Sequence, residues 1–248
     1  MLFRSRDDNA LAQMDHLISI GLNAFRLPVG WQFLVGSVAG GPLNATNVAA
    51  YDALVQGCLN SGAALCLIDI HNYARWDTKI IGQGGPTNAQ FASVWSQLAA
   101  KYKGESRIAF GIMNEPHDVP DIKAWAVSVQ AAVTAIREAG ATTQMIFLPG
   151  NDWTSAAKFI SNGSGDALKN VTNPDGSVTG LIMDVHNYLD SDNSGTNTEC
   201  VTNNIDDAFA PLADWLRANN RQAFLSETGG GNVASCETLM CQQLEYLK

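Results

Sequence analysis

The sequence predicts an α/β fold in which parallel strands alternate with helices. Short apolar runs and longer amphipathic segments follow one another along the 248 residues. Hydrophobic residues make up 46% of the chain and charged residues only 16%, so it can bury a large core. No linker, low-complexity stretch or internal repeat divides the sequence. We therefore expect residues 1–248 to form a single domain.

The N-terminal half begins this alternation. Apolar residues at spacings of three and four predict an amphipathic helix over residues 9–20, ended by Gly21. An apolar strand is expected at 24–29, followed by a polar loop and a helix at 47–60. The next segment, 63–70, is a continuous apolar run, which is typical of a strand buried on both faces of a parallel sheet.

The second half continues the pattern to the end of the chain. We expect, in order, a helix at 87–102, a strand at 108–113, a helix at 121–139 closed by Gly140, strands at 144–148 and 181–185, a helix at 204–219, a strand at 222–225 and a helix from 236 onward. Strands separated by helices pair in parallel through right-handed crossovers. A doubly wound sheet remains an alternative, but no glycine-rich phosphate loop follows any strand.

Polar residues gather at the C-terminal ends of the expected strands. They are Arg26, His71, Asn114, Glu115, His186, Tyr188 and Glu227. In a TIM (β/α)8 barrel these ends converge on one mouth, where catalytic groups from several strands meet. This coincidence favours the barrel over the doubly wound sheet.

Two glutamates among them suit glycoside hydrolysis. Glu115 precedes Pro116, which predicts an extended backbone that points the carboxyl group into the mouth. Glu227 precedes three glycines, which would let the backbone approach a ligand closely. Retaining hydrolysis needs one carboxyl to protonate the leaving oxygen and another to attack the anomeric carbon. Arg26 would then stabilise the ionised carboxylate of Glu227.

Two histidines repeat one local pattern. His71 and His186 each open a His-Asn-Tyr sequence after an aspartate-containing apolar strand. Together with the glutamates they could serve as metal ligands, which is the main chemical alternative. The His-x-His pattern of many metallohydrolase barrels is absent, so a metal is not expected.

Tryptophans divide into two groups. Trp31, Trp76 and Trp153 fall in expected loops beyond strand ends, where a ring could stack on the flat face of a sugar. Hydrophobic packing is the alternative for each of them. The remaining three fall within helical patterns and are expected in the core: Trp95, Trp125 and Trp215.

Charge and composition exclude several partner classes. The net charge is −9 and the basic residues are scattered, so neither nucleic acid nor a membrane surface is an expected partner. No apolar run approaches the roughly 20 residues that span a bilayer. The N-terminus has no secretory signal, yet three glycosylation acceptors point to a secretory pathway: Asn44-Ala45-Thr46, Asn162-Gly163-Ser164 and Asn170-Val171-Thr172.

The five cysteines also point to a secretory pathway, although from the sequence alone they could form disulfides or remain buried free thiols. Metal ligation is disfavoured because no Cys-x-x-Cys pair or nearby histidine completes a tetrahedral set.

The whole set of motifs resembles glycoside hydrolase family 5, and within it the secreted fungal endo-β-1,4-glucanases, or cellulases. The resemblance covers essentially the whole chain and rests on Asn23-Ala24-Phe25-Arg26-Leu27-Pro28, Asp69-Ile70-His71-Asn72-Tyr73-Ala74-Arg75-Trp76, Gly111-Ile112-Met113-Asn114-Glu115-Pro116-His117, Pro149-Gly150-Asn151-Asp152-Trp153, Asp184-Val185-His186-Asn187-Tyr188-Leu189-Asp190-Ser191-Asp192 and Ser226-Glu227-Thr228-Gly229-Gly230-Gly231. It implies a (β/α)8 barrel, β-glucan substrates, no cofactor, a monomer and an extracellular location. β-Mannan or mixed-linkage glucan remains an alternative substrate, and an inactive carbohydrate-binding barrel remains an alternative function.

The resemblance also implies roles for individual residues. Glu115 would be the acid/base and Glu227 the nucleophile, supported by Arg26 and Tyr188. Asn114 would bind the 2-hydroxyl of the sugar being cleaved. The other expected substrate contacts are His71, His186, Trp76, Trp153 and His117.

Two departures from the family pattern lead to further expectations. The family barrel has a strand before residue 9 and an eighth strand after the last one here, so we expect a truncated barrel that lacks the first and eighth strands. Its unpaired edges would make this chain prone to aggregation or weakly active. The implied disulfides are Cys58–Cys66 and Cys200–Cys236, and Cys241 is left without a partner.

Overall fold

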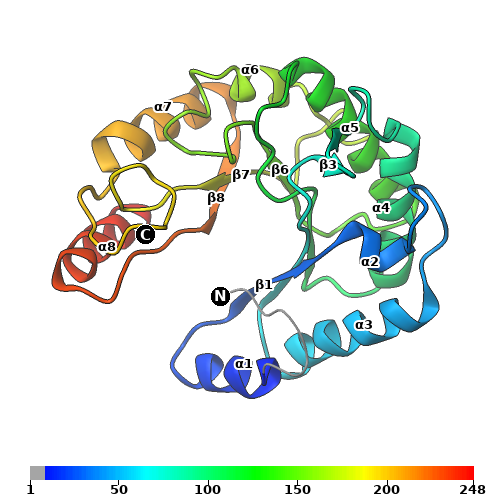
Figure 1. The fold of residues 1–248 in the computed structure, drawn as a ribbon, viewed down its shortest axis with the longest axis horizontal. Helices are drawn as coiled ribbons and strands as arrows, with labels where there is room; N and C mark the ends of the chain where they lie inside the picture. The colour runs from blue at the N-terminus through cyan, green and yellow to red at the C-terminus, as the bar shows by residue number, and fades with distance from the viewer. Residues whose placement is uncertain (1–8) are drawn as a thin grey trace.

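The computed structural model describes residues 9–248, in which six strands form one parallel sheet in the order β1-β2-β5-β6-β7-β8 (Figure 1). These strands are β1 (Ala24–Val29), β2 (Leu65–Ile70), β5 (Ile108–Gly111), β6 (Ile146–Pro149), β7 (Leu181–His186) and β8 (Gln222–Glu227). A small antiparallel pair, β3 (Arg75–Trp76) and β4 (Lys79–Ile80), lies in the connection after β2. All six expected strands are therefore confirmed, with ends shifted by a few residues.

The longer helices form an open arc on the outer side of the curved sheet (Figure 1). They are α1 (Ala10–Ser19), α3 (Ala45–Asn60), α4 (Asn88–Tyr102), α5 (Ile122–Glu138), α7 (Ala210–Asn219) and α8 (Ala234–Leu247). Shorter helical segments are α2 (Trp31–Val35), α6 (Ser164–Leu168) and the π-helix η2 (Ile205–Phe209), and the sequence did not predict α2 or α6.

The expected helix boundaries have a local chemical basis. A capping box begins α4, where the Thr87 side chain and the Gln90 side chain bond to each other's backbone N–H groups. The Asp121 carboxylate caps α5 by accepting from two backbone N–H groups. Gly21 and Gly140 follow α1 and α5 with φ values of 97° and 96°, a left-handed turn that glycine adopts without steric cost.

Strand order distinguishes between the two fold alternatives. A doubly wound sheet reverses its order at a switch point, whereas here each strand pairs with the next strand of the sheet along the chain. Every crossover consequently advances in the same direction around the arc, as in a (β/α) barrel. The outer strands β1 and β8 each pair on one side only within residues 9–248.

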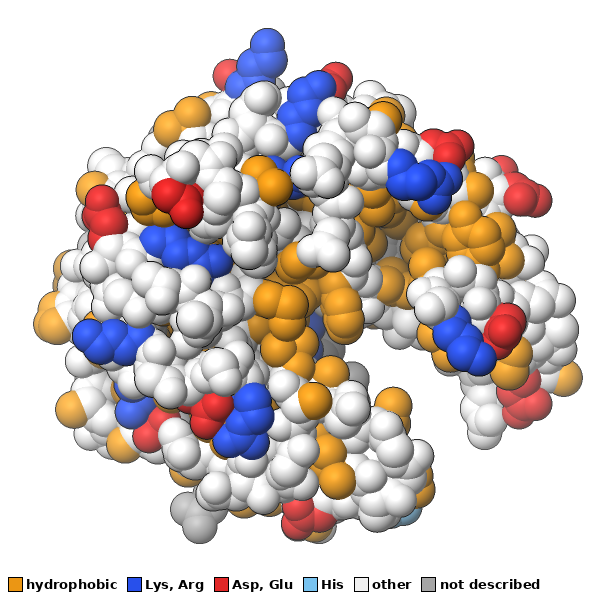
Figure 2. All heavy atoms as spheres, turned by 180° about the vertical axis from the view of Figure 1, so that it is seen from behind, with side chains coloured by type: hydrophobic (Ala, Val, Ile, Leu, Met, Phe, Trp, Pro, Cys, Tyr) orange, Lys and Arg blue, Asp and Glu red, His pale blue; other side chains and the backbone are white. Residues whose placement is uncertain are grey.

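Both faces of the sheet are apolar. In β2, Cys66 and Ile68 pack outward into the main core between sheet and helices. Leu67 faces the other way and joins Ala109, Phe147 and Ile182 in a smaller cluster. From behind, hydrophobic side chains line the hollow that the curved sheet surrounds (Figure 2). This alternation explains the continuous apolar strands of the sequence.

The remaining large-scale expectations concern termini and membranes. Among residues 9–248, no helix combines the length and hydropathy needed to cross a membrane. The expectation about a secretory signal concerns residues 1–8, which lie outside the described residues.

Candidate active site

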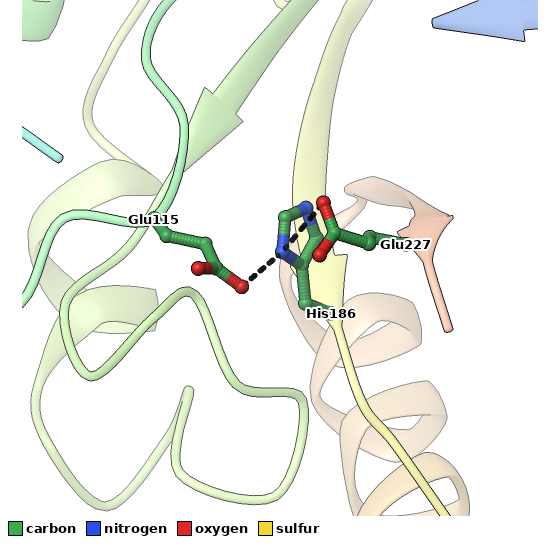
Figure 3. Close-up of side chains that lie close together, drawn as sticks. All are labelled: Glu115, His186 and Glu227. Atoms are coloured by element: carbon green, nitrogen blue, oxygen red, sulfur yellow. Dashed lines mark hydrogen bonds and ion pairs between the residues drawn. The ribbon is translucent and has the colours of Figure 1, made fainter. Parts of the chain in front are cut away.

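Three side chains from different strands converge at the C-terminal edge of the sheet (Figure 3). Glu115 follows β5, whereas His186 and Glu227 end β7 and β8. Nδ1 of His186 lies 2.9 Å from Oε1 of Glu115 and 3.9 Å from Oε2 of Glu227. One oxygen or nitrogen of each side chain lies within 4.8 Å of the others. The two expected glutamates therefore face the same small space.

The carboxylate of Glu227 is held by two donors. Nη1 of Arg26 donates to Oε2 at 2.6 Å, and the hydroxyl of Tyr188 donates to Oε1 at 2.5 Å. Burial raises the pKa of Glu227, but the charge of His186, the Tyr188 hydrogen bond and the charge of Arg26 outweigh burial and lower this pKa below its ordinary value. Glu227 thus remains ionised in mildly acidic solution.

Arg26 connects this carboxylate to buried polar groups behind it. Its Nη2 donates to Oδ1 of Asn114 at 2.5 Å and lies 3.1 Å from Oδ2 of Asp69. Burial lowers the pKa of Arg26, but Asp69 and Asp184 outweigh it and raise this pKa. The guanidinium therefore stays charged, and it fixes the orientation of Asn114.

Asn114 contains an unsatisfied donor. Its side chain is 1% exposed, and its Nδ2 has no hydrogen-bond partner among the described residues. Buried donors are nearly always paired in folded proteins. The amide next to the two glutamates is accordingly suited to an acceptor that a ligand supplies.

The backbone of Glu115 differs from expectation. Its φ is 40°, in the left-handed region, and not extended as Pro116 predicted. The clash with proline disfavours the right-handed helical region, but it leaves more than one other conformation open. The hydrogen bond to His186 and the bond from Trp153 N to Pro116 O, at 2.9 Å, hold the segment in this conformation. Such a conformation costs on the order of 1–3 kcal/mol.

Each histidine is oriented by a buried aspartate that sequence reasoning did not single out. Nδ1 of His71 lies 2.8 Å from Oδ2 of Asp69. Nε2 of His186 lies 3.0 Å from the Ser226 hydroxyl, which donates to Asp184. Burial raises the pKa of Asp184, although His186 and Arg26 oppose this effect. The signal was present in the sequence, because each aspartate precedes its histidine by two positions and shares its strand face.

A cavity of about 430 Å³ opens beside Glu115. Its lining includes Trp153, Lys158, His186, Tyr188 and Asn193. The Trp153 ring is 46% exposed and stacks on His117, with ring centroids 4.8 Å apart and planes 6° from parallel. The Trp153 ring is thus exposed, as a sugar-stacking residue must be, and the substrate contacts of Trp153 and His117 stay predictions.

The other two loop tryptophans lie elsewhere. Trp31 begins α2 and is completely buried, so the expectation of a sugar-stacking loop residue is wrong for it. The apolar side chains of α2 carry it into the core, and the ring of Trp76 packs edge-on against it at 4.8 Å. Trp76 is half-buried and is not part of the hydrogen-bonded cluster within the described residues.

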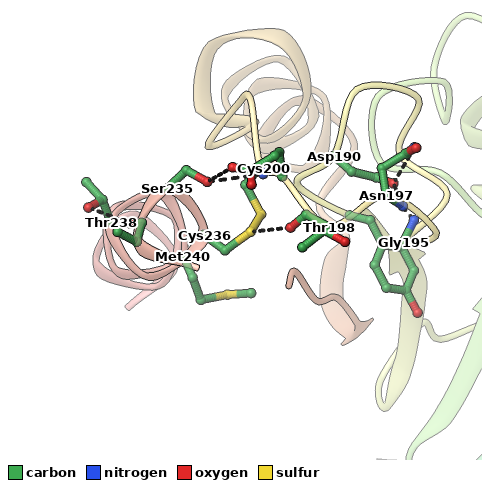
Figure 4. The surroundings of a disulfide bond; sticks show 12 residues. Asp190, Gly195, Asn197, Thr198, Cys200, Ser235, Cys236, Thr238 and Met240 are labelled. Carbon is green, nitrogen blue, oxygen red and sulfur yellow. Dashed lines mark hydrogen bonds between the residues drawn. A yellow bond between two sulfur atoms is a disulfide. The ribbon is translucent and has the colours of Figure 1, made fainter. Parts of the chain in front are cut away.

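The glycines after Glu227 serve the protein's own packing. A Cβ on Gly230 would lie 2.5 Å from Sγ of Cys200, and one on Gly231 would lie 2.2 Å from the Thr198 carbonyl. Neither glycine has a positive φ. Their small size admits the disulfide Cys200–Cys236, which ties the loop after β7 to α8 (Figure 4). The close approach of this backbone to a ligand stays a prediction.

The second disulfide joins Cys58 in α3 to Cys66 in β2. Both pairs are those implied by the family resemblance. Cys241 is a free, exposed thiol.

Glu115, His186 and Glu227 also form a set that could bind a divalent cation. In the described geometry these ligand atoms already bond to one another and to Arg26. A cation would have to displace the guanidinium from Glu227, and the positive charge of Arg26 opposes its approach.

Comparison with known proteins supports membership of the family that the sequence resembles. The sequence pattern of the family described as "Cellulase (glycosyl hydrolase family 5)" matches residues 3–248. Endoglucanase EG-II of Hypocrea jecorina is 66% identical over 240 residues, covering 96% of this chain and 57% of that protein. The manganese dependent endoglucanase Eg5A of Phanerodontia chrysosporium is 51% identical over 240 residues, covering 96% of this chain and 61% of that protein.

A solved structure agrees as closely. The crystal structure of Cel5A (EG2) from Hypocrea jecorina (Trichoderma reesei) has a TM-score of 0.94 at 66% identity, and the match covers 96% of this chain and 72% of that chain. The chain spans about three fifths of the length of the curated relatives that it matches. The family pattern nevertheless covers nearly every residue present, including all the strand ends described above. The chain belongs to the cellulase family, glycosyl hydrolase family 5.

Proposed function

We propose that this chain carries the catalytic site of a retaining endo-β-1,4-glucanase, which hydrolyses internal β-1,4-glucosidic bonds of cellulose and related β-glucans. The observation that carries the proposal is the approach of Glu115 to Glu227, with an oxygen of each within 4.8 Å of the other. Retaining enzymes hold their carboxyl groups about 5–5.5 Å apart, whereas inverting enzymes leave about 6.5–9.5 Å for a water molecule. The short separation favours double displacement.

Glu227 is the proposed nucleophile. Its lowered pKa keeps it ionised, and the donors Arg26 and Tyr188 hold both of its oxygens. One oxygen would attack the anomeric carbon and form a glycosyl-enzyme intermediate. Tyr188 and Arg26 orient the carboxylate for attack. They also stabilise its negative charge when Glu227 leaves the sugar in the second displacement.

Glu115 is the proposed acid/base, and the direction of the hydrogen bonds around His186 supports this role. The Ser226 hydroxyl donates to Asp184, so Nε2 of His186 must supply the proton shared with Ser226. Nδ1 of His186 lies 2.9 Å from Oε1 of Glu115, so a proton can be held between these two atoms. In the proposed mechanism Glu115 passes this proton to the leaving oxygen.

The substrate contacts follow from the remaining groups. The unsatisfied Nδ2 of Asn114 suits a sugar hydroxyl near the anomeric carbon, as the family resemblance implies for the 2-hydroxyl. The cavity is lined by Glu115 but not by Glu227, which favours its use by the leaving part of the chain. Stacked Trp153 and His117 offer a flat face to pyranose C–H groups there.

The test combines two variants with product analysis. Glu115→Gln and Glu227→Gln should each lower kcat on carboxymethyl-cellulose by several orders of magnitude, because each removes one half of the carboxyl pair. Proton NMR of early products should give the β anomer. An α product, or full turnover by either variant, would overturn the mechanism. Parallel assays on β-mannan and barley β-glucan identify the preferred polysaccharide.

The name of the Phanerodontia relative favours a second possibility, a requirement for manganese. Glu115, His186 and Glu227 are the side chains that would hold the ion. We propose that hydrolysis proceeds with carboxylates alone, so exhaustive chelation should leave kcat unchanged. Activity that is lost with the chelator and restored by Mn²⁺ would favour the metal-dependent alternative.

We further propose that the chain acts as a secreted, monomeric, single-domain enzyme whose barrel is completed by strands beyond those described. Its support is the one-sided pairing of β1 and β8 and the 42% exposure of Phe224, which contacts Phe147 at 5.4 Å on the concave face. Soluble yield and sedimentation of residues 1–248 alone, compared with a version carrying added flanking strands, test the idea. Equal behaviour of the two would contradict it.

A further inference from the structure

We propose that Asn170 is an N-glycosylation site, and that the first N-acetylglucosamine of its glycan covers an apolar groove between α5 and α6. Because N-glycans are added in the secretory pathway, the inference rests on the secretion proposed above. It concerns the outer surface of the arc of helices and is independent of the catalytic site.

The groove lies where α5 and α6 run side by side on the outside of the fold (Figure 1). It has a volume of about 570 Å³, within the range of cavities that bind small ligands. Five of its ten lining residues have apolar side chains, and Lys123 and Asp166 also line it; the apolar ones are Ile122, Ala126, Val127, Ala167 and Val171. Val127 is 59% exposed, whereas Ala126 and Val171 are buried, so the part of the groove that faces solvent without a cover in residues 9–248 is centred on Val127.

Asn170 stands on the wall of this same groove and belongs to the acceptor sequence Asn170-Val171-Thr172. Its side chain is exposed, and its Nδ2 donates a single hydrogen bond, to the Asp166 carbonyl at 3.0 Å. A glycosylated amide keeps one N–H, so this bond can persist after modification.

The backbone beside Asn170 is fixed against α5. Nε2 of Gln130 donates to the Thr172 carbonyl at 2.8 Å, and the Thr172 N–H donates to Oε1 of Gln130 at 2.9 Å. This pair of bonds anchors the acceptor segment to the groove wall. A sugar attached to Asn170 is therefore held next to the apolar patch, onto which its C–H face and acetyl methyl group can pack.

The other two acceptor sequences behave differently. Both hydrogens of the Asn162 amide are in use, toward the Asn151 carbonyl at 3.2 Å and Asp152 at 3.1 Å. Its Ser164 is completely buried and bonds to the backbone of Asn151. Modification there would break contacts that hold the loop preceding Trp153, so we expect Asn162 to remain unmodified.

Asn44 is exposed at the start of α3, where its Oδ1 caps the helix and its Nδ2 makes no hydrogen bond within the described residues. It is open to modification. It does not line the groove between α5 and α6, so it provides a matched control.

Glycosylation of Asn170 exchanges one bond for another at C1 of the sugar. Nδ2 of Asn170 attacks C1 of the N-acetylglucosamine of a lipid-pyrophosphate-linked oligosaccharide. The bond between C1 and the pyrophosphate oxygen breaks, and the lipid pyrophosphate leaves with the electron pair. One amide proton passes to a base of the glycosyltransferase.

The test uses the full-length chain secreted from yeast. Glycopeptide mass spectrometry should find the glycan at Asn170. Thr172→Ala should abolish it without changing the asparagine, and Thr172→Ser should restore it. Thr46→Ala is the matched control, because it removes the acceptor at Asn44 and leaves the groove covered. An unmodified Asn170 in the secreted protein would overturn the site.

The covering of the groove has its own readout. Binding of a hydrophobic fluorescent dye should rise about twofold or more in Thr172→Ala but not in Thr46→Ala. When the glycan of the folded protein is trimmed to one N-acetylglucosamine, dye binding should stay low, whereas complete removal of the glycan should raise it. Because this measurement starts from the glycosylated protein, it remains possible even if Thr172→Ala is not secreted. Equal dye binding by all forms, or self-association through the groove of the glycosylated protein, would overturn the cover. Hydrolysis of β-glucan reports the proposed function separately and should be unaffected by Thr172→Ala.

Discussion

Replacing Tyr188 by phenylalanine should shift the acidic limb of the pH–activity profile to higher pH. The change removes the hydroxyl that donates to Oε1 of Glu227 at 2.5 Å and leaves the ring in place. Hydrogen bonds to charged groups contribute about 1.5–3 kcal/mol, and one pKa unit corresponds to about 1.4 kcal/mol. The side chain of Glu227 is 19% exposed, so water replaces part of the loss. We therefore expect its pKa to rise by about one unit.

The sign follows from which form is active. Glu227 must be ionised, and protonation on the acidic side abolishes attack. Removing a contact that lowers its pKa makes that protonation occur at higher pH, so kcat/KM should begin to fall about one unit earlier. Profiles of kcat/KM on a soluble β-glucan from about pH 3 to 7 measure the shift.

A matched control distinguishes this effect from general loss of a tyrosine hydroxyl. The Tyr102 hydroxyl also donates to a carboxylate, Asp52, at 2.8 Å, and it does so outside the hydrogen-bonded cluster around Glu227. Tyr102→Phe should leave the acidic limb in place. An unmoved limb in Tyr188→Phe, or one displaced to lower pH, would refute the reasoning about the charge of Glu227.

Three further outcomes are expected from other contacts. Trp153→Ala should raise KM for long β-glucans about tenfold with an unchanged melting temperature, because the ring on His117 is exposed; an unchanged KM would contradict the sugar platform. Cys236→Ser opens a 36-residue loop and should lower the free energy of unfolding by about 4 kcal/mol, against about 2.5 kcal/mol for the eight residues opened by Cys66→Ser; chemical denaturation tests this ranking. The pKa of Glu227 is lower in the folded chain than in the unfolded one, so its ionisation stabilises the fold above the unfolded pKa, and this stabilisation is lost as the pH falls through the folded pKa. Between about pH 5 and 3, Glu227→Gln should therefore lose less stability than the unaltered chain. Identical pH slopes of the two proteins in thermal denaturation would argue against this linkage.

The fold was predictable to the extent that its elements have local signals. Apolar runs located all six strands, and Gly21 and Gly140 located two helix ends. The short helices α2 and α6 escaped because five residues contain too little periodicity. Trp31 was misplaced for the same reason, since only tertiary packing decides whether an isolated tryptophan in such a segment is buried.

Positions of site residues were predictable, but their conformations were not. Strand ends brought Arg26, Glu115, His186 and Glu227 together as the barrel rule requires. Proline restricts the residue before it without fixing one alternative, so the left-handed Glu115 could not be foreseen. The packing role of the glycines after Glu227 could not be foreseen, because one half of the disulfide that they accommodate, Cys200, lies in a different loop of the chain.

The left-handed backbone of Glu115 has a consequence for heat inactivation. A residue in this region remains there only while its neighbours enforce it, and here the neighbours are loop atoms and one histidine. Loops open at lower free-energy cost than core strands. On warming, Glu115 should relax while the sheet is still intact, so hydrolysis should cease several degrees below the melting temperature and return on cooling. The temperature at which the enzyme stops working is then set by a loop, and the temperature at which it unfolds is set by the core.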